Sequence, residues 1–214
     1  VAVHGPALPG FFRSYFDVFR QDHMLEVAHM AHAFAQMLAC SNVITSGVLE
    51  RFSKLRIAFL EAGSGWVPYW MHRMDEYNEV APERWAMISS EPSDYIKSGR
   101  VFFSCEPGDP DIPYFLANVG EQSMLFASDY LHFDAHFIGE IGHDGTPYPG
   151  TVNSLLGRDD ITTSARTKMM YDNPLAFYKN LISADLGRIG DPVAREEPPL
   201  MKNRDMPGTV AARL

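Results

Sequence analysis

Several residues that can bind a metal ion or move a proton lie together in the segment 122–137. Within it, the apolar run 124–127 has the length and composition of a strand buried on both faces. Asp129 follows at the carboxyl end of this run, where parallel α/β proteins carry their chemistry. A carboxylate there can bind a hard or borderline metal ion, or take a proton from a metal-bound water. The structural alternative is that Asp129 starts an Asx-turn or caps the next segment.

Three further β-prone runs also end in an ionisable residue: 1–4 in His4, 55–60 in Glu61 and 100–105 in Glu106. A neutral imidazole such as that of His4 is the commonest metal ligand. A buried carboxylate such as Glu61 can act as a general base or as a ligand. The structural alternatives are a terminal histidine without a role and an ion pair between Glu61 and Arg73.

Residues 11–50 are predicted to be mostly helical, with a second helix over about 43–52. Leu25, His29, His32 and Gln36 fall on one helical face by their spacing. Such a face could line a polar pocket or hydrogen-bond at an interface. The structural interpretation is preferred for His29, and both interpretations stay open for His32.

The order of the elements predicts a parallel sheet. Strands near 1–4, 55–60, 100–105 and 123–127 alternate with helical segments, which is the pattern of β-α units. A (β/α)8 barrel takes roughly 250 residues, and this chain offers half of the strands. A doubly wound open sheet is the alternative, but no glycine-rich phosphate loop follows any strand.

Composition excludes several classes of protein. The chain has 214 residues, a net charge of −9 and no Lys/Arg-rich run, which argues against a nucleic-acid surface. No apolar run is long enough to span a bilayer. Cys40 and Cys105 lie in apolar contexts without CxxC spacing, which indicates buried thiols in a reducing, cytoplasmic compartment. The first residues already have the pattern of a strand end, so we expect the fold to begin before Val1.

The last residues differ in composition from the rest of the chain. The segment 183–214 is rich in Pro, Gly, Arg and Asp and has too few apolar residues to form its own core. We therefore expect one domain over 1–182 and an extended arm over 183–214 that lies on a partner or stays disordered.

Three motifs, in this order and spacing, resemble one enzyme family. They are FSKLRIAFLEAGSGWVPYWMHRMD over 52–75, FSCEP over 103–107 and FASDYLH over 126–132. They resemble the amidohydrolase-related metal-dependent hydrolases, in the branch of the aminocarboxymuconate-semialdehyde decarboxylase-like enzymes. The resemblance covers residues 1 to about 180. It implies the C-terminal half, strands 5–8, of a distorted (β/α)8 barrel completed by another chain or by a missing N-terminal half.

The resemblance also implies roles for individual residues. His4 matches a metal-binding histidine, Asp129 matches an aspartate that binds metal or handles the proton of its water, and His32 matches a histidine in the following helical segment. The implied cofactor is a divalent metal, most often zinc, with iron or manganese as alternatives. Asp129, Glu61 and His32 are the expected catalytic residues. The expected contacts to a small-molecule substrate come from Glu106, Trp66 and His132.

The sequence departs from the family pattern in two places, and these departures limit which function can be predicted. Glu61 stands where decarboxylases of this branch carry a catalytic histidine, and no His-x-His occurs in the chain. The sequence therefore favours a metal-dependent hydrolase or lyase acting on a small organic acid or an amide- or ester-like substrate. A partner chain would then supply strands 1–4 and a His-x-His pair. The alternatives are a non-oxidative decarboxylase and a non-catalytic structural subunit.

Overall fold

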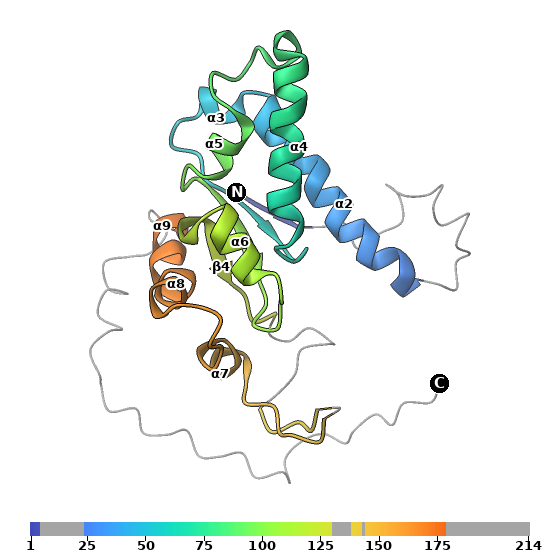
Figure 1. The fold of residues 1–214 in the computed structure, drawn as a ribbon, viewed down its shortest axis with the longest axis vertical. Helices are drawn as coiled ribbons and strands as arrows, with labels where there is room; N and C mark the ends of the chain where they lie inside the picture. Colours follow the sequence, from blue (N-terminus) through green and yellow to red (C-terminus); the bar gives the residue numbers. More distant parts are fainter. Residues whose placement is uncertain (5–23, 130–137, 143, 179–214) are drawn as a thin grey trace. The chain divides into compact units, whose positions relative to one another are not determined.

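The structure is a computed structural model that describes residues 1–4, 24–129, 138–142 and 144–178 (Figure 1). The chain divides into a unit Val1–Tyr178 and a segment Lys179–Leu214. That segment lies outside the described residues, as does His132. The predicted arm over 183–214 and the predicted substrate contact of His132 therefore remain expectations.

Four strands form one parallel sheet, in the order in which they occur along the chain. They are β1 (Ala2–His4), β2 (Ile57–Leu60), β3 (Val101–Cys105) and β4 (Met124–Phe126). The register aligns His4 with Leu60 and Cys105 with Phe126. The predicted parallel α/β sheet is confirmed, with strand ends within about two residues of the expected positions. Because the strands are parallel, the residues that follow them all lie along the same side of the sheet, at the carboxyl ends of the strands.

In the described part of the chain, a helix comes after each of the first three strands. These helices are α2 (Met24–Thr45), α4 (Trp66–Val80) and α6 (Ile112–Asn118). Pro68 lies in the first turn of α4, where its missing N–H costs no hydrogen bond. The shorter elements are α3 (Val48–Arg51), the 3₁₀ helices η1 (Pro82–Trp85) and η2 (Glu121–Ser123), α5 (Pro92–Ile96), α7 (Thr151–Leu156), α8 (Thr163–Thr167), the π-helix η3 (Lys168–Asp172) and α9 (Asn173–Tyr178).

The predicted helix over 43–52 is divided differently in the structure. Helix α2 continues to Thr45, and α3 begins only after Gly47. Gly47 has a φ of 66°, and a Cβ atom at this position would lie 2.4 Å from the Met87 carbonyl oxygen. The chain therefore turns at the one residue type that fits there. The presence of a glycine in the sequence does not by itself show how far the preceding helix extends.

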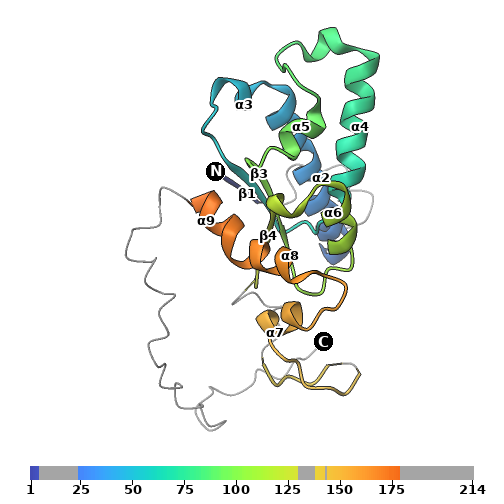
Figure 2. The ribbon, with the colours of Figure 1, turned by 60° about the vertical axis from the view of Figure 1, so that its left-hand side comes forward.

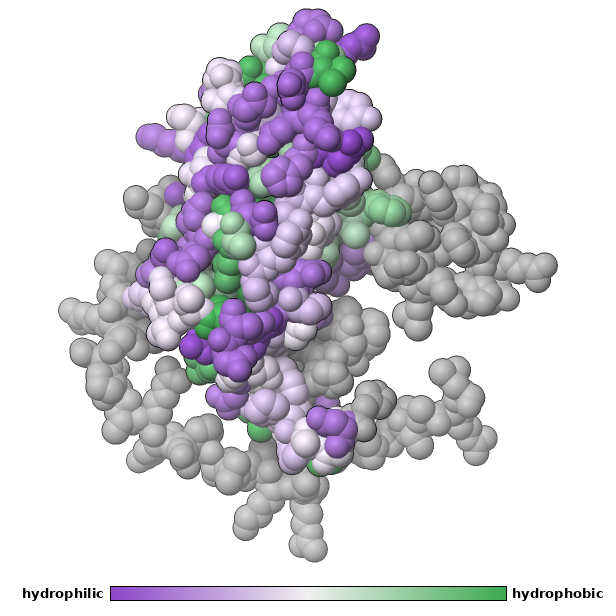
Figure 3. All heavy atoms as spheres, in the orientation of Figure 1, coloured by the Kyte–Doolittle hydropathy of each residue, from purple (hydrophilic) through white to green (hydrophobic). Residues whose placement is uncertain are grey.

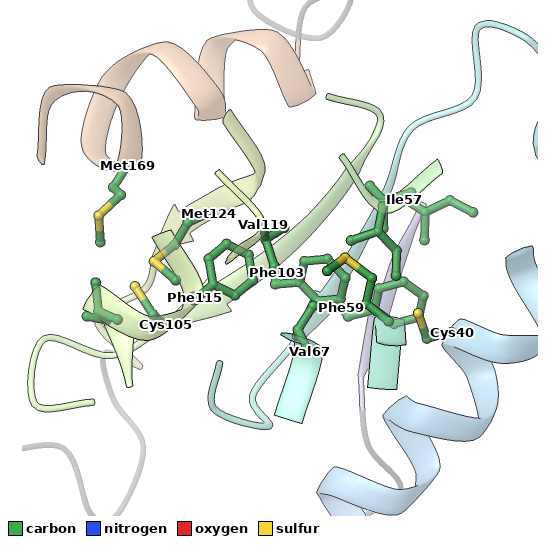
Figure 4. Packing of buried hydrophobic residues seen from close by; sticks show 14 of the residues in the cluster. Cys40, Ile57, Phe59, Val67, Phe103, Cys105, Phe115, Val119, Met124 and Met169 are labelled. Carbon is green, nitrogen blue, oxygen red and sulfur yellow. The ribbon is translucent and has the colours of Figure 1, made fainter. Parts of the chain in front are cut away.

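The main core lies between the sheet and the helices of one face. Phe59 and Phe103 stack at 5.5 Å between ring centroids, and Phe115 of α6 meets Phe103 edge to face at 5.7 Å (Figure 4). Val67 of α4 and Cys40 of α2 belong to the same buried cluster. Figure 2 shows α2, α4 and α6 together beside the sheet. This packing holds the strand ends in fixed register beneath the site.

The opposite face of the sheet carries a smaller apolar cluster. Ala58, Phe102 and Leu125 alternate with the core residues along their strands and are buried. Phe177 of α9 packs on this face, 5.4 Å from the Phe102 ring. Asn173, the first residue of α9, donates from Nδ2 to the carbonyl oxygens of Glu121 and Met124, each at 2.7 Å. Helix α9 is thereby tied to β4.

The face of the molecule drawn in Figure 3 is mainly hydrophilic, with hydrophobic side chains scattered among the hydrophilic ones. None of the helices in the described part of the chain has the length and apolar character needed to cross a membrane.

Candidate active site

Three of the predicted site residues meet at the carboxyl ends of β1 and β2. His4 ends β1, and Glu61 follows β2 directly beside it. The His4 Nε2 atom contacts the Glu61 Oε2 atom. His32 reaches the same place from α2, with its Nδ1 atom 3.2 Å from the Glu61 carbonyl oxygen and 3.6 Å from Oε1. The His4 and His32 rings lie edge to face at 5.6 Å, so two imidazoles and one carboxylate form a compact cluster.

The backbone at Glu61 is in a left-handed conformation. Among the described residues, Glu61 (φ 63°) and Asp129 (φ 49°) are the non-glycine residues with positive φ. Such a conformation costs on the order of 1–3 kcal/mol and persists only where the surrounding structure holds it. At Glu61 the backbone N–H donates to Ser104 Oγ at 2.9 Å. Each of these two strained residues follows a strand, and each is a predicted catalytic residue.

A pocket of about 220 Å³ opens beside this cluster. It lies between the loops that follow β2 and β3, and its lining residues are Glu61, Gly63, Ser104, Glu106, Gly108 and Asp109. Glu106, an expected substrate contact, is in this lining. Trp66 is not: its ring packs edge to face on Phe103 at 5.6 Å, against the core. The substrate contact of Trp66 stays a prediction.

The two loops around the pocket are tied together by a carboxylate that the sequence analysis missed. Asp109 Oδ2 accepts hydrogen bonds from the backbone N–H and the hydroxyl of Ser64, at 2.9 and 2.7 Å. Its Oδ1 accepts from the Asp111 N–H at 2.8 Å, as in an Asx-turn. The Asp-Pro-Asp sequence before α6 was the only local signal, and it indicates the turn but not the bond to Ser64.

Arg158 holds the β3–α6 loop from the other side. Its Nη1 atom donates to the carbonyl oxygens of Pro107 and Asp109, at 3.0 and 2.6 Å. Its other nitrogens bind the Asp160 carboxylate at 2.9 and 2.6 Å. The hydrogen bonds to Asp160 are the main cause that raises the pKa of Arg158, so the guanidinium stays charged. Since this cation faces backbone carbonyls and Asp160, it shapes the pocket wall.

The structure also defines the surroundings of Arg73 and Cys105. Arg73, the alternative partner of Glu61, pairs instead with Glu76. Burial raises the pKa of the Cys105 thiol at the end of β3 to about 12. The thiol therefore stays protonated at neutral pH and is a poor nucleophile.

Asp129 and His4 lie at the two opposite edges of the sheet, both at the carboxyl ends of their strands. The strands β1 and β4 that precede these residues are the first and last of the four. Three strand spacings of about 4.8 Å place them on the order of 14 Å apart in a flat sheet. In the part of the chain that the structure describes, no group of three or more His, Cys, Asp or Glu side chains is arranged to hold a metal ion.

The donor types nevertheless suit a divalent metal. Imidazole nitrogen and carboxylate oxygen are ligands of zinc and of non-haem iron. His4 ends β1 and supplies an imidazole nitrogen, and Asp129 follows β4 and supplies a carboxylate oxygen. These two residues would form part of a ligand set, and Glu61 and His32 lie beside His4.

These features define a parallel α/β protein with an imidazole–carboxylate cluster at the carboxyl ends of its strands, where such folds carry their sites. A family model described as Amidohydrolase matches residues 2–179. The chain belongs to the amidohydrolase family, whose members usually bind a divalent metal. No functionally curated protein matches the sequence.

Three solved structures share the fold. An amidohydrolase from Mycobacterium avium subsp. paratuberculosis K-10 is 22% identical, and the match covers 64% of this chain and 31% of the amidohydrolase chain, with a TM-score of 0.50. The 5-carboxyvanillate decarboxylase LigW from Sphingomonas paucimobilis is 16% identical, covering 83% and 48%, with a TM-score of 0.57. A protein named amidohydrolase II is 17% identical, covering 84% and 51%, with a TM-score of 0.58. The matches thus span 31% to 51% of the length of these proteins, as a partial amidohydrolase barrel would.

Proposed function

We propose that the chain is the C-terminal half of a metal-dependent hydrolase or lyase of the amidohydrolase type. Its substrate would be a small organic acid or an amide- or ester-like compound. The observation that carries this proposal is the meeting of His4, His32 and Glu61 at the strand ends, with the Glu61 backbone held in a strained conformation. Strain of this kind gathers at functional sites, where the geometry of one side chain outweighs stability.

The roles follow from the positions of the side chains. Glu61 faces the pocket and is the group to accept a proton from an attacking nucleophile. His32 contacts the Glu61 carbonyl oxygen and carboxylate, so it orients that base. His4 and Asp129 would hold the divalent metal, most simply zinc, with iron or manganese as alternatives. A bound divalent ion would act as a Lewis acid toward a substrate carbonyl or carboxylate.

A partner chain, or a missing N-terminal half, would complete the barrel. The described sheet has four parallel strands, and a closed barrel of this type has eight. The chain also lacks a His-x-His pair. A partner that brings strands 1–4 and this pair would close the sheet and bring β1 and β4 to face one interior, which would allow His4 and Asp129 to share one ion.

Decarboxylation is the second candidate function. The 5-carboxyvanillate decarboxylase among the similar structures supports it, and release of CO₂ from an aromatic or unsaturated acid is its direct readout. A non-catalytic structural subunit is the third candidate and predicts no metal affinity.

Metal binding distinguishes an enzyme half from a structural subunit. A tagged chain, purified from its source with bound partners retained, is titrated with zinc against a chromophoric chelator. We expect His4→Ala to lower the zinc affinity at least about tenfold, since it removes a ligand. His72→Ala is the matched control, because His72 is exposed on α4 away from the cluster. Equal affinity of the wild type and His4→Ala would contradict the proposal.

A further inference from the structure

A polar side chain occupies an apolar position on the buried side of α2. Gln36, Cys40 and Ile44 follow one another at intervals of four residues, so they share one face of the helix. All three are fully buried. Cys40 and Ile44 belong to the main apolar core. A glutamine in this row needs a reason, because burying an amide costs free energy unless its groups are hydrogen-bonded.

The Gln36 amide bridges the two strands that carry the cluster. Its Nε2 atom donates to the Val3 carbonyl oxygen at 3.0 Å and to the Leu60 carbonyl oxygen at 2.8 Å. Val3 and Leu60 immediately precede His4 and Glu61 in the sequence. One side chain thus holds the backbone on the approach to both of these residues.

The same helix carries the third member of the cluster. His32 lies one turn before Gln36 on α2, and its ring contacts Glu61. Gln36 therefore fixes α2 against β1 and β2 at the height where His32 has to meet His4 and Glu61.

The other half of the amide is not hydrogen-bonded. Both partners of Nε2 are carbonyl oxygens, so the amide nitrogen has to face them and the amide cannot be flipped. The Gln36 Oε1 atom is buried and has no hydrogen-bond partner in the described structure. The amide therefore makes its contacts through the nitrogen alone, toward the two strands.

We propose that Gln36 is the positioning residue of the site: its two hydrogen bonds hold β1, β2 and α2 so that His4, Glu61 and His32 meet. Gln36 does not contact the pocket and acts through these three residues. Its importance for catalysis rests on the proposed function, but the arrangement itself can be measured without metal, substrate or activity.

The test uses the full chain with ¹³C-labelled histidine. In the wild type, the His4 and His32 ring protons should give a nuclear Overhauser cross-peak, since the rings lie edge to face at 5.6 Å. Gln36→Met introduces an apolar side chain of similar length and removes both hydrogen bonds. We expect the cross-peak to disappear and the unfolding midpoint to fall by a few °C, because the Val3 and Leu60 carbonyl oxygens lose a donor while the unsatisfied Oε1 atom is removed.

Asn173→Leu is the matched control. Asn173 also donates from one amide nitrogen to two carbonyl oxygens, but those of Glu121 in η2 and Met124 in β4. It should lower the midpoint and leave the His4–His32 cross-peak at wild-type intensity.

Each other outcome overturns the inference. A cross-peak that survives in Gln36→Met, or that is absent from the wild type, contradicts the positioning role. Equal loss in Asn173→Leu would mean that general loosening explains the effect. If Gln36→Met does not fold, Gln36→Leu replaces it, and failure of both to fold would assign Gln36 to the stability of the domain. Absence of zinc binding or turnover would refute the proposed function and leave this result unaffected.

Discussion

The variant Glu61→Gly should be more stable than the variant Glu61→Ala, which reverses the usual order of these two residue types. Glu61 has a φ of 63°, and for any residue with a Cβ atom this conformation costs about 1–2 kcal/mol. Glycine avoids that cost but loses about 0.5–1 kcal/mol through the greater freedom of the unfolded chain. The net advantage of Glu61→Gly over Glu61→Ala is therefore about 1 kcal/mol. Both variants lack the carboxylate, so the contact with His4 cancels from the comparison.

The assay is thermal and urea unfolding of the two variants. For a chain of this size, about 1 kcal/mol shifts the midpoint by roughly 2–4 °C. The control pair is His72→Gly and His72→Ala, at an exposed position in the middle of α4. There the ordinary order should hold, with glycine about 1 kcal/mol less stable than alanine. If Glu61→Ala is as stable as Glu61→Gly, the backbone at this site is not strained and the reasoning fails.

Two further outcomes are expected. Ser64→Ala should lower the free energy of unfolding by about 1 kcal/mol, because it removes the buried hydroxyl bond to Asp109; an unchanged urea midpoint would show that the loop is held otherwise. Burial raises the pKa of both Cys40 and Cys105 from 9.0 to about 12. The folded chain then keeps protons that the unfolded chain releases, so stability is full below pH 9 and falls as the pH rises toward 12. Cys40→Ala with Cys105→Ala should flatten this alkaline loss, and an equal loss in that variant would assign it to other groups.

The sequence predicted those features that depend on local pattern. Four apolar runs that alternate with helical segments were enough to predict the parallel sheet, because each run is short and ends in a polar residue. Since parallel strands share one carboxyl edge, the ends of neighbouring runs were expected to meet. His4 and Glu61 do so in the structure.

The rest depends on contacts between distant segments. His32 meets Glu61 only because Gln36 sets α2 against the strands, and spacing on the helix shows a shared face without showing what it faces. Ser64 and Asp109 are 45 residues apart, so no local rule predicts their bond. Local pattern does not decide the role of Trp66 either: an aromatic residue beside a glycine-rich turn suits a pocket and a core equally, and in the structure its ring packs on Phe103.

The central proposal is that the chain forms half of a barrel and contributes His4 and Asp129 to one metal ion. The direct test is anomalous diffraction at the zinc edge, from crystals of the chain together with the chain or segment that completes the barrel. The account predicts one peak within about 2.0–2.2 Å of a His4 imidazole nitrogen and of an Asp129 carboxylate oxygen. A completed barrel whose metal lies away from His4 and Asp129, or which binds none at saturating zinc, would contradict it.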